Sequence, residues 1–445
     1  MRIVMYQTYS GIYDDREIVQ TYYPSKSDMW KALAEKYPQH EIVFVTRSSG
    51  YMLLEKDKDG TVIEPSGIRC VLIDEALVPA DFAQVIVDLA PAVAVAVSSP
   101  EMPLDWNSLE DAIIAEILQE HGIKTIAQKI FTAIATFDKW RTHLVLRELG
   151  FGVAKAVYIH NDLFWAESKI AGIESNVYKH YIQYRVENLS YPVIVKDTVG
   201  VASIGIQIVD TPEEAWKILT SGNKGTDVLV EELIRGEQFG TEIHGVKGSY
   251  HVLPPFRLGL NDEGIVDPVT GMKFGPVLSE QYNVRQLQES LRRLAETLEF
   301  GGSAEIDLAF RDGKWYVIEI NPRMSGLTST AAAAEERTPL DIYMESALGS
   351  AVDYSDPENL RYTLTFRVPT PSDDALRELN GLDHVIEISN VKSTVANIVF
   401  ENSGFVLGGF ASVAELFEEL TALRERYPEI FTEKIVHDAR FLAEG

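Results

Sequence analysis

The stretch Ser303–Gly326 reads SAEIDLAFRDGKWYVIEINPRMSG, and it decides the fold of the chain around it. Two runs with the alternation of β-strands flank Asp312-Gly313, a dipeptide typical of tight hairpin turns. The second run stops at Asn321-Pro322, because proline has no N–H to donate to a strand ladder. The sequence therefore predicts a β-hairpin that ends at EINPR.

The register of this hairpin decides which carboxylates meet. A two-residue loop would place Glu319 on the face opposite to Asp307. A three-residue loop, with Gly313 in the left-handed conformation, pairs Phe310 with Lys314 and gathers the polar side chains on one face. We predict this second register, which brings together Glu305, Asp307, Glu319 and Asn321.

Three carboxylates and an amide on one strand face repel one another unless a cation binds them. Ligands that are all oxygen favour Mg²⁺ or Mn²⁺ over Zn²⁺. The opposite face is predicted to pack into a core through Ile306, Leu308, Phe310, Tyr316, Ile318 and Ile320. An edge hairpin with a solvated polar face is the alternative.

A second cluster, Tyr191–Ile206, reads YPVIVKDTVGVASIGI. An apolar strand carries Lys196 at its polar end, and a loop of small residues follows it, with Gly200, Ala202, Ser203 and Gly205. Small residues let backbone N–H groups approach phosphate oxygens, and the lysine adds a positive charge. The alternative is a plain hairpin with a strand-end lysine. Such a lysine contributes little to stability, so its loss should affect phosphate binding more than the fold.

A third cluster, Val228–Glu242, reads VLVEELIRGEQFGTE. A short apolar strand that leads into two carboxylates suits an adenine pocket, where backbone amide groups and an acidic side chain meet the base. Glu231 is the candidate for that contact, and a solvated strand-end carboxylate is the alternative.

Strands alternate with helices before these clusters, which predicts a parallel sheet covered on both faces and ending near Ala127. The expected strands are Arg2–Tyr6, Glu41–Thr46, Cys70–Ile73 and Ala92–Val97, and the expected helices are Asp28–Tyr37, Asp81–Leu89 and Leu109–His121. Further along, helices are expected at Asp138–Leu149, Asn283–Leu298, Thr328–Ala347 and Ser412–Tyr427, and β-structure at Val153–Ile159, Ser190–Val209, Asp227–Lys247, Arg361–Val368 and Val395–Val406.

The composition of the chain argues against some classes of binding partner. The chain has 445 residues, of which 46% are hydrophobic, enough for roughly two to four compact units. Its formal net charge of -27 opposes nonspecific attraction to nucleic acid or to an anionic membrane. The sequence has one cysteine, Cys70, and its N-terminus lacks the pattern of a signal peptide. We therefore expect a cytoplasmic protein with no nucleic-acid partner and no membrane anchor.

The order of the three clusters resembles the ATP-grasp superfamily, over roughly Asp138–Gly349. The resemblance implies an α/β and α+β fold in three parts. The first is an N-terminal α/β domain with a parallel sheet, 1–127. The second is an ATP-grasp region of two α+β lobes, 128–350, with its small lobe at about 155–232. The third is a C-terminal α/β extension, 351–445, an α+β lobe that completes the catalytic domain.

The resemblance also implies roles for single residues. Lys139, in the DKW segment, and Lys196 look like the two phosphate-binding lysines, and Arg323 looks like the arginine that steadies substrate or acyl phosphate. The implied catalytic residues are Arg323 and Lys196. The implied nucleotide-binding residues are Lys139, Lys196, Ser203, Glu231, Glu232, Leu233, Ile234 and Gln238. The implied metal ligands are Asp307, Glu319 and Asn321.

Two departures from the family pattern concern the nucleotide site. Val201, Ala202 and Ile204 stand where glycine or arginine is often found, and Gln238 stands where a ribose-binding glutamate is common. The irregular stretch His251–Tyr282 is expected to frame the substrate pocket. Arg257 or Arg285 is a candidate to bind a substrate carboxylate there, with surface arginines as the alternative.

The activity that the resemblance implies is ATP-dependent ligation of a carboxylate to an amine, such as an amino acid, with release of ADP and phosphate. ATP and Mg²⁺ or Mn²⁺ are the implied cofactors, and the partners are small-molecule carboxylates and amines, with a homodimer left open. Three alternatives remain: a carbamoyl-phosphate or carboxylase type of reaction, an acid-thiol ligase, and a regulator that binds ATP without catalysis.

Overall fold

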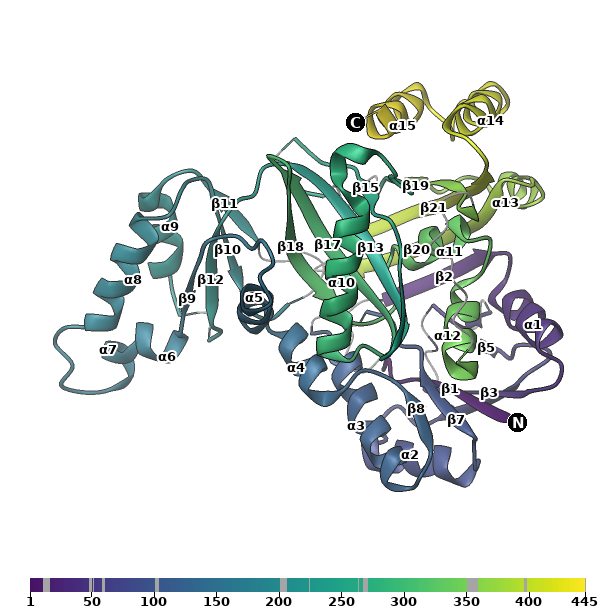
Figure 1. Cartoon of the computed structure of the whole chain (residues 1–445), viewed down its shortest axis with the longest axis horizontal. Coiled ribbons are helices and arrows are strands. Elements are labelled where there is room, and N and C mark those ends of the chain that lie inside the picture. Colours follow the sequence, from purple (N-terminus) through teal and green to yellow (C-terminus); the bar gives the residue numbers. More distant parts are fainter. Residues whose placement is uncertain are drawn as a thin grey trace.

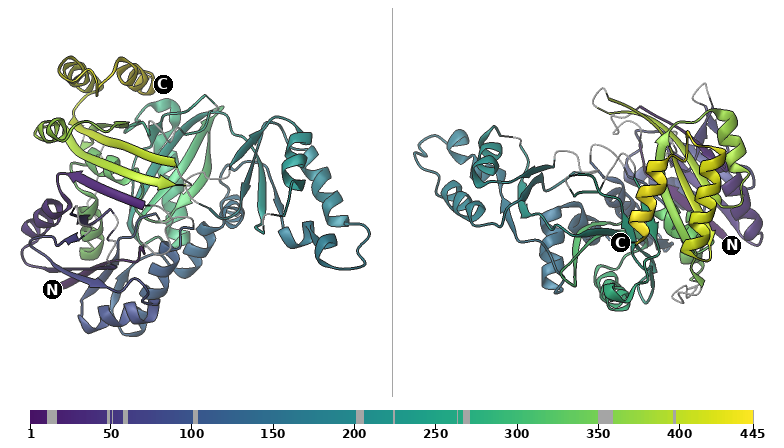
Figure 2. Two further views of the ribbon diagram at one scale, coloured as in Figure 1. Left: turned by 180° about the vertical axis from the view of Figure 1, so that it is seen from behind. Right: turned by 90° about the horizontal axis from the view of Figure 1, so that it is seen from above.

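The computed structural model describes residues 1–10, 17–47, 50, 52–57, 61–100, 104–200, 206–223, 225–262, 264–266, 271–349, 359–395 and 398–444. The chain folds into an N-terminal α/β layer, a small lobe and a long central sheet that the C-terminal strands extend (Figure 1). The small lobe projects away from the other two parts, as both views in Figure 2 show. The expected mixture of α/β and α+β structure is confirmed.

The N-terminal layer is a parallel sheet, as the alternation of strands and helices predicts. In the described chain its strands are β6 (Arg69–Ile73), β3 (Glu41–Arg47), β1 (Arg2–Gln7), β7 (Val93–Ala96) and β8 (Lys124–Ile126), in that spatial order. The helices beside them are α1 (Lys26–Lys36), α2 (Pro79–Asp88) and α3 (Asn107–Glu120). Ile3 and Met5 pack on the side of α1, whereas Val4 and Tyr6 pack against α2 and α3. Burial on both faces explains the unbroken apolar run of β1.

One strand of the first segment lies outside this layer. β2 (Glu17–Tyr23) pairs antiparallel with β20 (Val385–Val395), which belongs to the last segment of the chain. The sequence gives no sign of this pairing, because the partner strand lies near the opposite end of the chain. The boundaries at 127 and 350 remain predictions.

The small lobe is an antiparallel sheet with helices on it. Its described strands follow the order β11 (Gln207–Val209), β10 (Val193–Asp197), β12 (Val228–Glu232) and β9 (Ala156–Ile159). Their apolar side chains pack with helices of the lobe in one core. The helices of the lobe are α6 (Asn161–Phe164), α7 (Ala166–Lys169), α8 (Val177–Glu187) and α9 (Pro212–Thr220). α4 (Ile130–Phe137) and α5 (Lys139–Glu148) precede the lobe in the chain.

The central sheet joins the middle of the chain to its end. Over the described residues its spatial order is β18 (Lys314–Asn321), β17 (Gly302–Arg311), β13 (Glu237–Val246), β15 (Phe256–Leu258), β16 (Lys273–Gly275), β19 (Tyr362–Pro369), β21 (Ile398–Phe410), β20 and β2, with β14 (Ser249–Val252) paired to β13. α10 (Val284–Leu298) packs on it through Leu287, Leu291 and Leu294, which follow the spacing of one helix face. α13 (Asp373–Asn380), α14 (Val413–Arg426) and α15 (Glu433–Glu444) cover the C-terminal strands.

The hairpin of β17 and β18 has the predicted polar face but not the predicted loop. Asp312 and Gly313 both have positive φ, 51° and 75°, so the turn has two residues and pairs Arg311 with Lys314. The predicted pairing of Phe310 with Lys314 is therefore wrong.

An irregularity in β18 restores the predicted polar face at the far end of the hairpin. Asp307 pairs with Glu319 and Leu308 pairs with Val317, so Ile318 is an extra residue in β18. Beyond this bulge Glu305, Asp307, Glu319 and Asn321 share one face, as predicted, although the predicted loop would have paired Asp307 with Val317. Toward the turn the faces are exchanged, so Trp315 and Val317 pack into the core in place of Tyr316 and Ile318.

The segment after the hairpin is not the single helix expected at Thr328–Ala347. It forms α11 (Thr328–Ala334) and α12 (Pro339–Leu348). α12 starts at Pro339 behind a capping box in which Thr338 and Asp341 bond reciprocally. Proline fits the first turn of a helix but breaks a helix interior, which explains the interruption.

The described residues contain no helix that is long and apolar enough to span a membrane.

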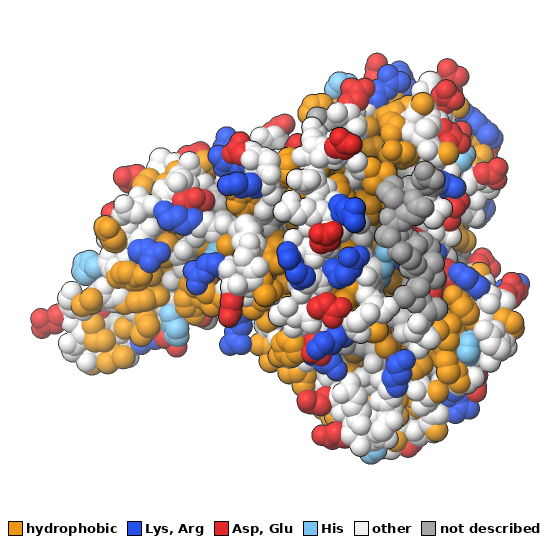
Figure 3. All heavy atoms as spheres, in the orientation of Figure 1, with side chains coloured by type: hydrophobic (Ala, Val, Ile, Leu, Met, Phe, Trp, Pro, Cys, Tyr) orange, Lys and Arg blue, Asp and Glu red, His pale blue; other side chains and the backbone are white. Residues whose placement is uncertain are grey.

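On the face shown in Figure 3, acidic and basic side chains are interspersed. The remaining short elements are β4 (Glu55–Lys56), β5 (Val62–Ile63) and the 3₁₀ turn Glu280–Tyr282.

Candidate active site

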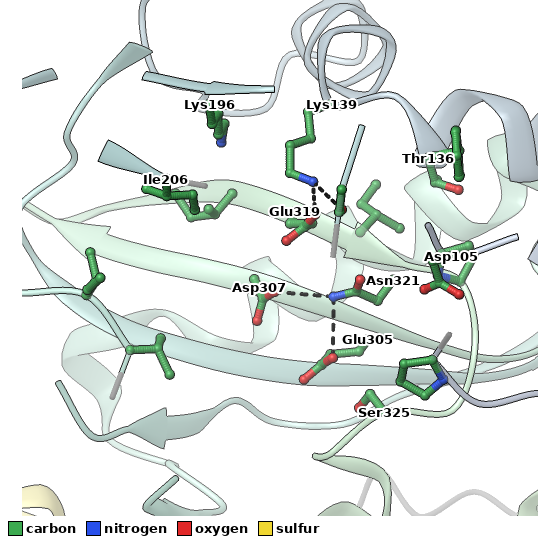
Figure 4. A pocket seen from close by; sticks show the side chains of 18 of the residues that line it. Asp105, Thr136, Lys139, Lys196, Ile206, Glu305, Asp307, Glu319, Asn321 and Ser325 are labelled. Atoms are coloured by element: carbon green, nitrogen blue, oxygen red, sulfur yellow. Dashed lines mark hydrogen bonds and ion pairs between the residues drawn. The ribbon is translucent and has the colours of Figure 1, made fainter. Parts of the chain in front are cut away.

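A cavity of about 490 Å³ lies where the small lobe, the central hairpin and the N-terminal layer meet (Figure 4). Segments far apart in sequence line it. Its lining includes Asp105, Leu109, Ala133, Phe137, Lys139, Lys196, Glu231, Gln238, Asp307, Glu319, Asn321 and Arg323. The structure thus brings together the three clusters that the sequence singles out.

Both predicted phosphate-binding lysines line this cavity. Asp138 caps α5 by accepting from the Arg141 N–H at 2.9 Å, which sets Lys139 at the first helical position. The Nζ of Lys139 lies 2.9 Å from Glu319 Oε1 and donates to Gly200 O at 2.9 Å. Lys139 therefore links the segment that follows β10 in the small lobe to the acidic hairpin.

Lys196 is more buried than a strand-end lysine should be. Only 7% of the residue is exposed, and its Nζ forms an ion pair with Glu231 on the neighbouring strand β12. The expectation that Lys196 matters little to stability assumed an exposed strand-end lysine, and the structure contradicts that premise. Loss of Lys196 would leave Glu231, 9% exposed, buried without its partner.

The acidic side chains of the hairpin repel one another. Burial and the charges of Glu305 and Glu319 raise the pKa of Asp307 well above its usual value. Burial and the charge of Glu242 raise the pKa of Glu305. Burial would also raise the pKa of Glu319, but the charge and hydrogen bond of Lys139 hold it below its usual value. The site therefore favours an added positive charge.

These donors fit Mg²⁺ with help from other ligands. Among the residues described, no three Asp, Glu, His or Cys side chains converge closely enough to hold an ion by themselves. Mg²⁺ is usually held by one or two carboxylates, with water and substrate phosphates completing its shell. Asp307 and Glu319 pair across the hairpin on the cavity side and match that pattern.

Asn321 and Arg323 lie beside these carboxylates. The Nδ2 of Asn321 donates to Asp307 Oδ2 at 3.3 Å and to Glu305 Oε2 at 3.4 Å, while its Oδ1 accepts from Arg323 Nη2 at 3.3 Å. In this arrangement the amide nitrogen faces the carboxylates, so a metal ligated through Oδ1 requires the amide to turn. The role of Asn321 as a ligand stays a prediction.

The predicted adenine segment also reaches the cavity, with Glu231, Glu232, Leu233, Ile234 and Gln238 in the lining. Two of its backbone donors are already engaged. The N–H groups of Glu232 and Leu233 donate to Lys155 O at 2.9 Å and to Pro192 O at 3.0 Å. A base would therefore be read by the other backbone groups of the segment. Ser203 lies outside the described residues.

The two arginines proposed for a substrate carboxylate do not line the cavity. Arg257 is buried and bonds Tyr282 and, at 2.7 Å, the carbonyl of Leu442, so it ties α15 to the central sheet. Arg285 is a surface residue with a side chain 94% exposed. The stretch His251–Tyr282 still contributes Leu258, Ile265 and Val266 to the lining.

Comparisons with known proteins find a similar domain and a similar fold. Residues 169–337 match the family model described as the D-ala D-ala ligase C-terminus. The model of the whole chain resembles the crystal structure of an L-amino acid ligase from Bacillus licheniformis, with a TM-score of 0.61, 16% identity, and coverage of 95% of this chain and 97% of that one. Residues 169–337 thus resemble an ATP-grasp domain.

Curated relatives match about a third of the chain. A D-alanine--D-alanine ligase of Buchnera aphidicola subsp. Schizaphis graminum is 27% identical over 150 residues, which are 34% of this chain and 44% of that protein. A carbamoyl phosphate synthase large chain of Thermotoga petrophila is 27% identical over 143 residues, 31% of this chain and 13% of that protein. The matched part thus spans less than half the length of either relative.

The structure brings two further carboxylates close to the acidic hairpin, and sequence reasoning missed both. Glu242 is fully buried, and burial raises its pKa to about 7. It accepts hydrogen bonds from Thr328 at 2.6 Å and from Ser325 at 3.2 Å, so it fixes the turn after the hairpin. Asp105 forms an ion pair with Arg323 Nε. The one sequence signal for Asp105 was its position after the carboxyl end of strand β7. Parallel sheets bind their ligands at that edge.

Removal of Lys196 should weaken ATP binding in this ATP-grasp domain. We expect Lys196→Ala to raise the dissociation constant of ATP at least roughly tenfold, about 1.4 kcal/mol, and also to lower the melting temperature, because Glu231 loses its partner. Calorimetry and thermal denaturation measure the two effects. In the double variant Lys196→Ala/Glu231→Gln, the melting temperature should recover while ATP affinity stays low. Unchanged affinity in Lys196→Ala would return the lysine to a structural role.

Proposed function

We propose that the protein is an ATP-dependent carboxylate-amine ligase that forms ADP. It would phosphorylate a carboxylate and join the resulting acyl phosphate to the amine of an amino acid or a similar compound. A carboxylate resists attack by an amine because oxide is a poor leaving group, and phosphorylation by ATP supplies a good one.

One observation carries this proposal. A single cavity holds two lysines from separate segments, a pair of facing carboxylates and a buried arginine, Lys139, Lys196, Asp307, Glu319 and Arg323. Cationic groups opposite metal-binding carboxylates suit the transfer of a phosphoryl group, which needs positioning and charge neutralisation. The arginine at the same site suits the next step, in which an acyl group is passed on.

Each of these residues has a task in this reaction. Lys139 and Lys196 hold phosphate oxygens, and Asp307 and Glu319 hold the divalent ion. When bound, Mg²⁺ supplies charge neutralisation of the phosphate groups. Lys139 must then exchange its present contact with Glu319 for a phosphate oxygen. This exchange is possible because the lysine and the carboxylate lie side by side.

Arg323 is positioned to act on the carboxylate being activated. Its hydrogen bonds to Asp105, Asn321 and the carbonyl of Met324 use one N–H on each of its three nitrogens. A guanidinium has five N–H groups, so, among the described residues, two N–H groups of Arg323 remain for a ligand. A planar pair of donors matches the oxygens of a carboxylate or an acyl phosphate.

A screen of amino acids in pairs, with ATP and Mg²⁺, tests the proposal. We expect ADP and phosphate to appear together with a condensed product that mass spectrometry detects. ADP release with bicarbonate instead would favour a carbamoyl-phosphate or carboxylase type of reaction, and release with a thiol acceptor would favour an acid-thiol ligase. ATP binding with no turnover under any of these conditions would favour the regulator.

A further inference from the structure

We propose that Asp105 binds the amine of the substrate, and that this amine carries an apolar side group. The inference deepens the ligase proposal and rests on it. Asp105 comes from the N-terminal layer, and no motif of the sequence points to a role for it.

The carboxylate of Asp105 has spare capacity to accept hydrogen bonds. Its Oδ2 accepts from Arg323 Nε, whereas its Oδ1 is buried and has no hydrogen-bond partner among the described residues. A carboxylate accepts about four hydrogen bonds. A buried acceptor without a partner is costly, so such groups in native proteins call for an explanation. The side chain lines the cavity and is 18% exposed, so a donor that enters the cavity can reach Oδ1 after a small rotation of the carboxylate (Figure 4).

The chemistry of Asp105 selects the kind of donor. An ionised carboxylate accepts only, and a protonated amine offers up to three N–H groups and a positive charge. Arg323 is already paired with this carboxylate, and its remaining N–H groups suit an acyl phosphate. The Arg323–Asp105 ion pair thus places an amine beside the acyl carbon. The bound ammonium first gives a proton to the Asp105 carboxylate, and the free amine then attacks the acyl carbon and phosphate leaves.

An apolar wall adjoins Asp105. Trp106, the next residue, stacks on Phe137 with ring centroids 5.1 Å apart. Phe137 lines the cavity, as do Ala133 one turn earlier on α4 and Leu109 in the first turn of α3. An amine held by Asp105 would direct its side group against this wall, where a polar group would lose its hydrogen bonds with water.

The amine contact is tested with Asp105→Asn, which keeps the size of the side chain and replaces one acceptor by a donor. The probes are hydroxylamine, a small neutral nucleophile that traps acyl phosphates, and whichever of leucine, valine and phenylalanine the wild type uses fastest as the amine. We expect kcat/KM for the amino acid, relative to that for hydroxylamine, to fall at least roughly tenfold. The ratio does not depend on the folded fraction of the variant.

Asp88→Asn is the matched control, because Asp88 is an exposed residue on α2 and the substitution changes the charge by the same amount. It should leave the ratio at the wild-type value. An unchanged ratio in Asp105→Asn overturns the amine contact. If the wild type forms neither a hydroxamate nor a condensed product, the ligase proposal itself fails, and this result is distinct from the first.

The apolar wall is tested with Phe137→Ala. We expect the preference for leucine over glycine as the amine, measured as a ratio of kcat/KM values in one preparation, to fall roughly tenfold. A preference that does not change, or a wild type that favours glycine or polar amines, overturns the apolar part of the inference.

Discussion

Replacing Glu319 by glutamine is expected to lower Mg-dependent ATP turnover at least roughly tenfold, which corresponds to about 1.4 kcal/mol of barrier. The substitution keeps the shape of the side chain and removes one negative charge from the pair formed with Asp307. It also removes the ionic partner of Lys139. The Mg²⁺ concentration that gives half-maximal turnover should therefore rise together with the loss of rate.

Two measurements separate a metal role from a general loss of structure. ADP release is followed over a titration with Mg²⁺, and the fold is checked by thermal denaturation. Glu289→Gln is the matched control, because Glu289 is an exposed residue on α10 with 59% of its side chain accessible. Near-normal turnover and an unchanged Mg²⁺ requirement in Glu319→Gln would remove Glu319 from the metal site.

Replacing Arg323 by lysine should separate nucleotide binding from ligation. The charge is kept, but a lysine cannot reproduce the planar fork that now bonds Asp105, Asn321 and the Met324 carbonyl. Loss of one preorganised donor to a developing oxyanion costs about 10²-fold in rate, so we expect product formation to fall roughly a hundredfold. ATP affinity should stay within about threefold, since the phosphate contacts come from the lysines.

The two quantities are measured on the same preparation, ATP affinity by calorimetry and product by mass spectrometry. Arg311→Lys is the control on the same hairpin, because Arg311 lies beside the turn with half of its side chain exposed. A parallel fall of affinity and product in Arg323→Lys would assign Arg323 to the nucleotide site. Normal values for both would show that the EINPR arginine has no role in either step.

The acidic hairpin shows how much of the site can be predicted from the local sequence pattern. Alternation, the Asp312-Gly313 turn signal and the stop at Pro322 predict the hairpin and its polar face. The bulge at Ile318 is not predictable in this way, because an extra residue in a strand leaves no mark on composition. The face on which Asp307 and Glu319 lie was predicted correctly for a reason that the structure corrects. A two-residue turn followed by a bulge puts both carboxylates on that face, whereas the predicted three-residue loop would have paired Asp307 with Val317.

Lys196 shows a second limit. Its type and its place at a strand end are visible in the sequence, and the structure places it in the cavity as expected. Its burial and its ion pair with Glu231 depend on the neighbour that β12 supplies, which is decided by strand pairing within the small lobe. Stability and binding effects of Lys196 therefore could not be separated before the fold was known.

The sequence by itself determined what is local: the alternation of strands and helices in the N-terminal layer, the hairpin, and the residue types that suit phosphate and a divalent ion. These features follow from side-chain period, turn chemistry and charge, which act between residues close in the chain. Tertiary structure alone decided what depends on segments that are distant in sequence. It joined β2 to β20, brought Asp105 to Arg323 and buried Glu242 beneath the turn after the hairpin. Those contacts are set by how whole elements pack, because a side chain carries no local record of a partner that lies hundreds of residues away.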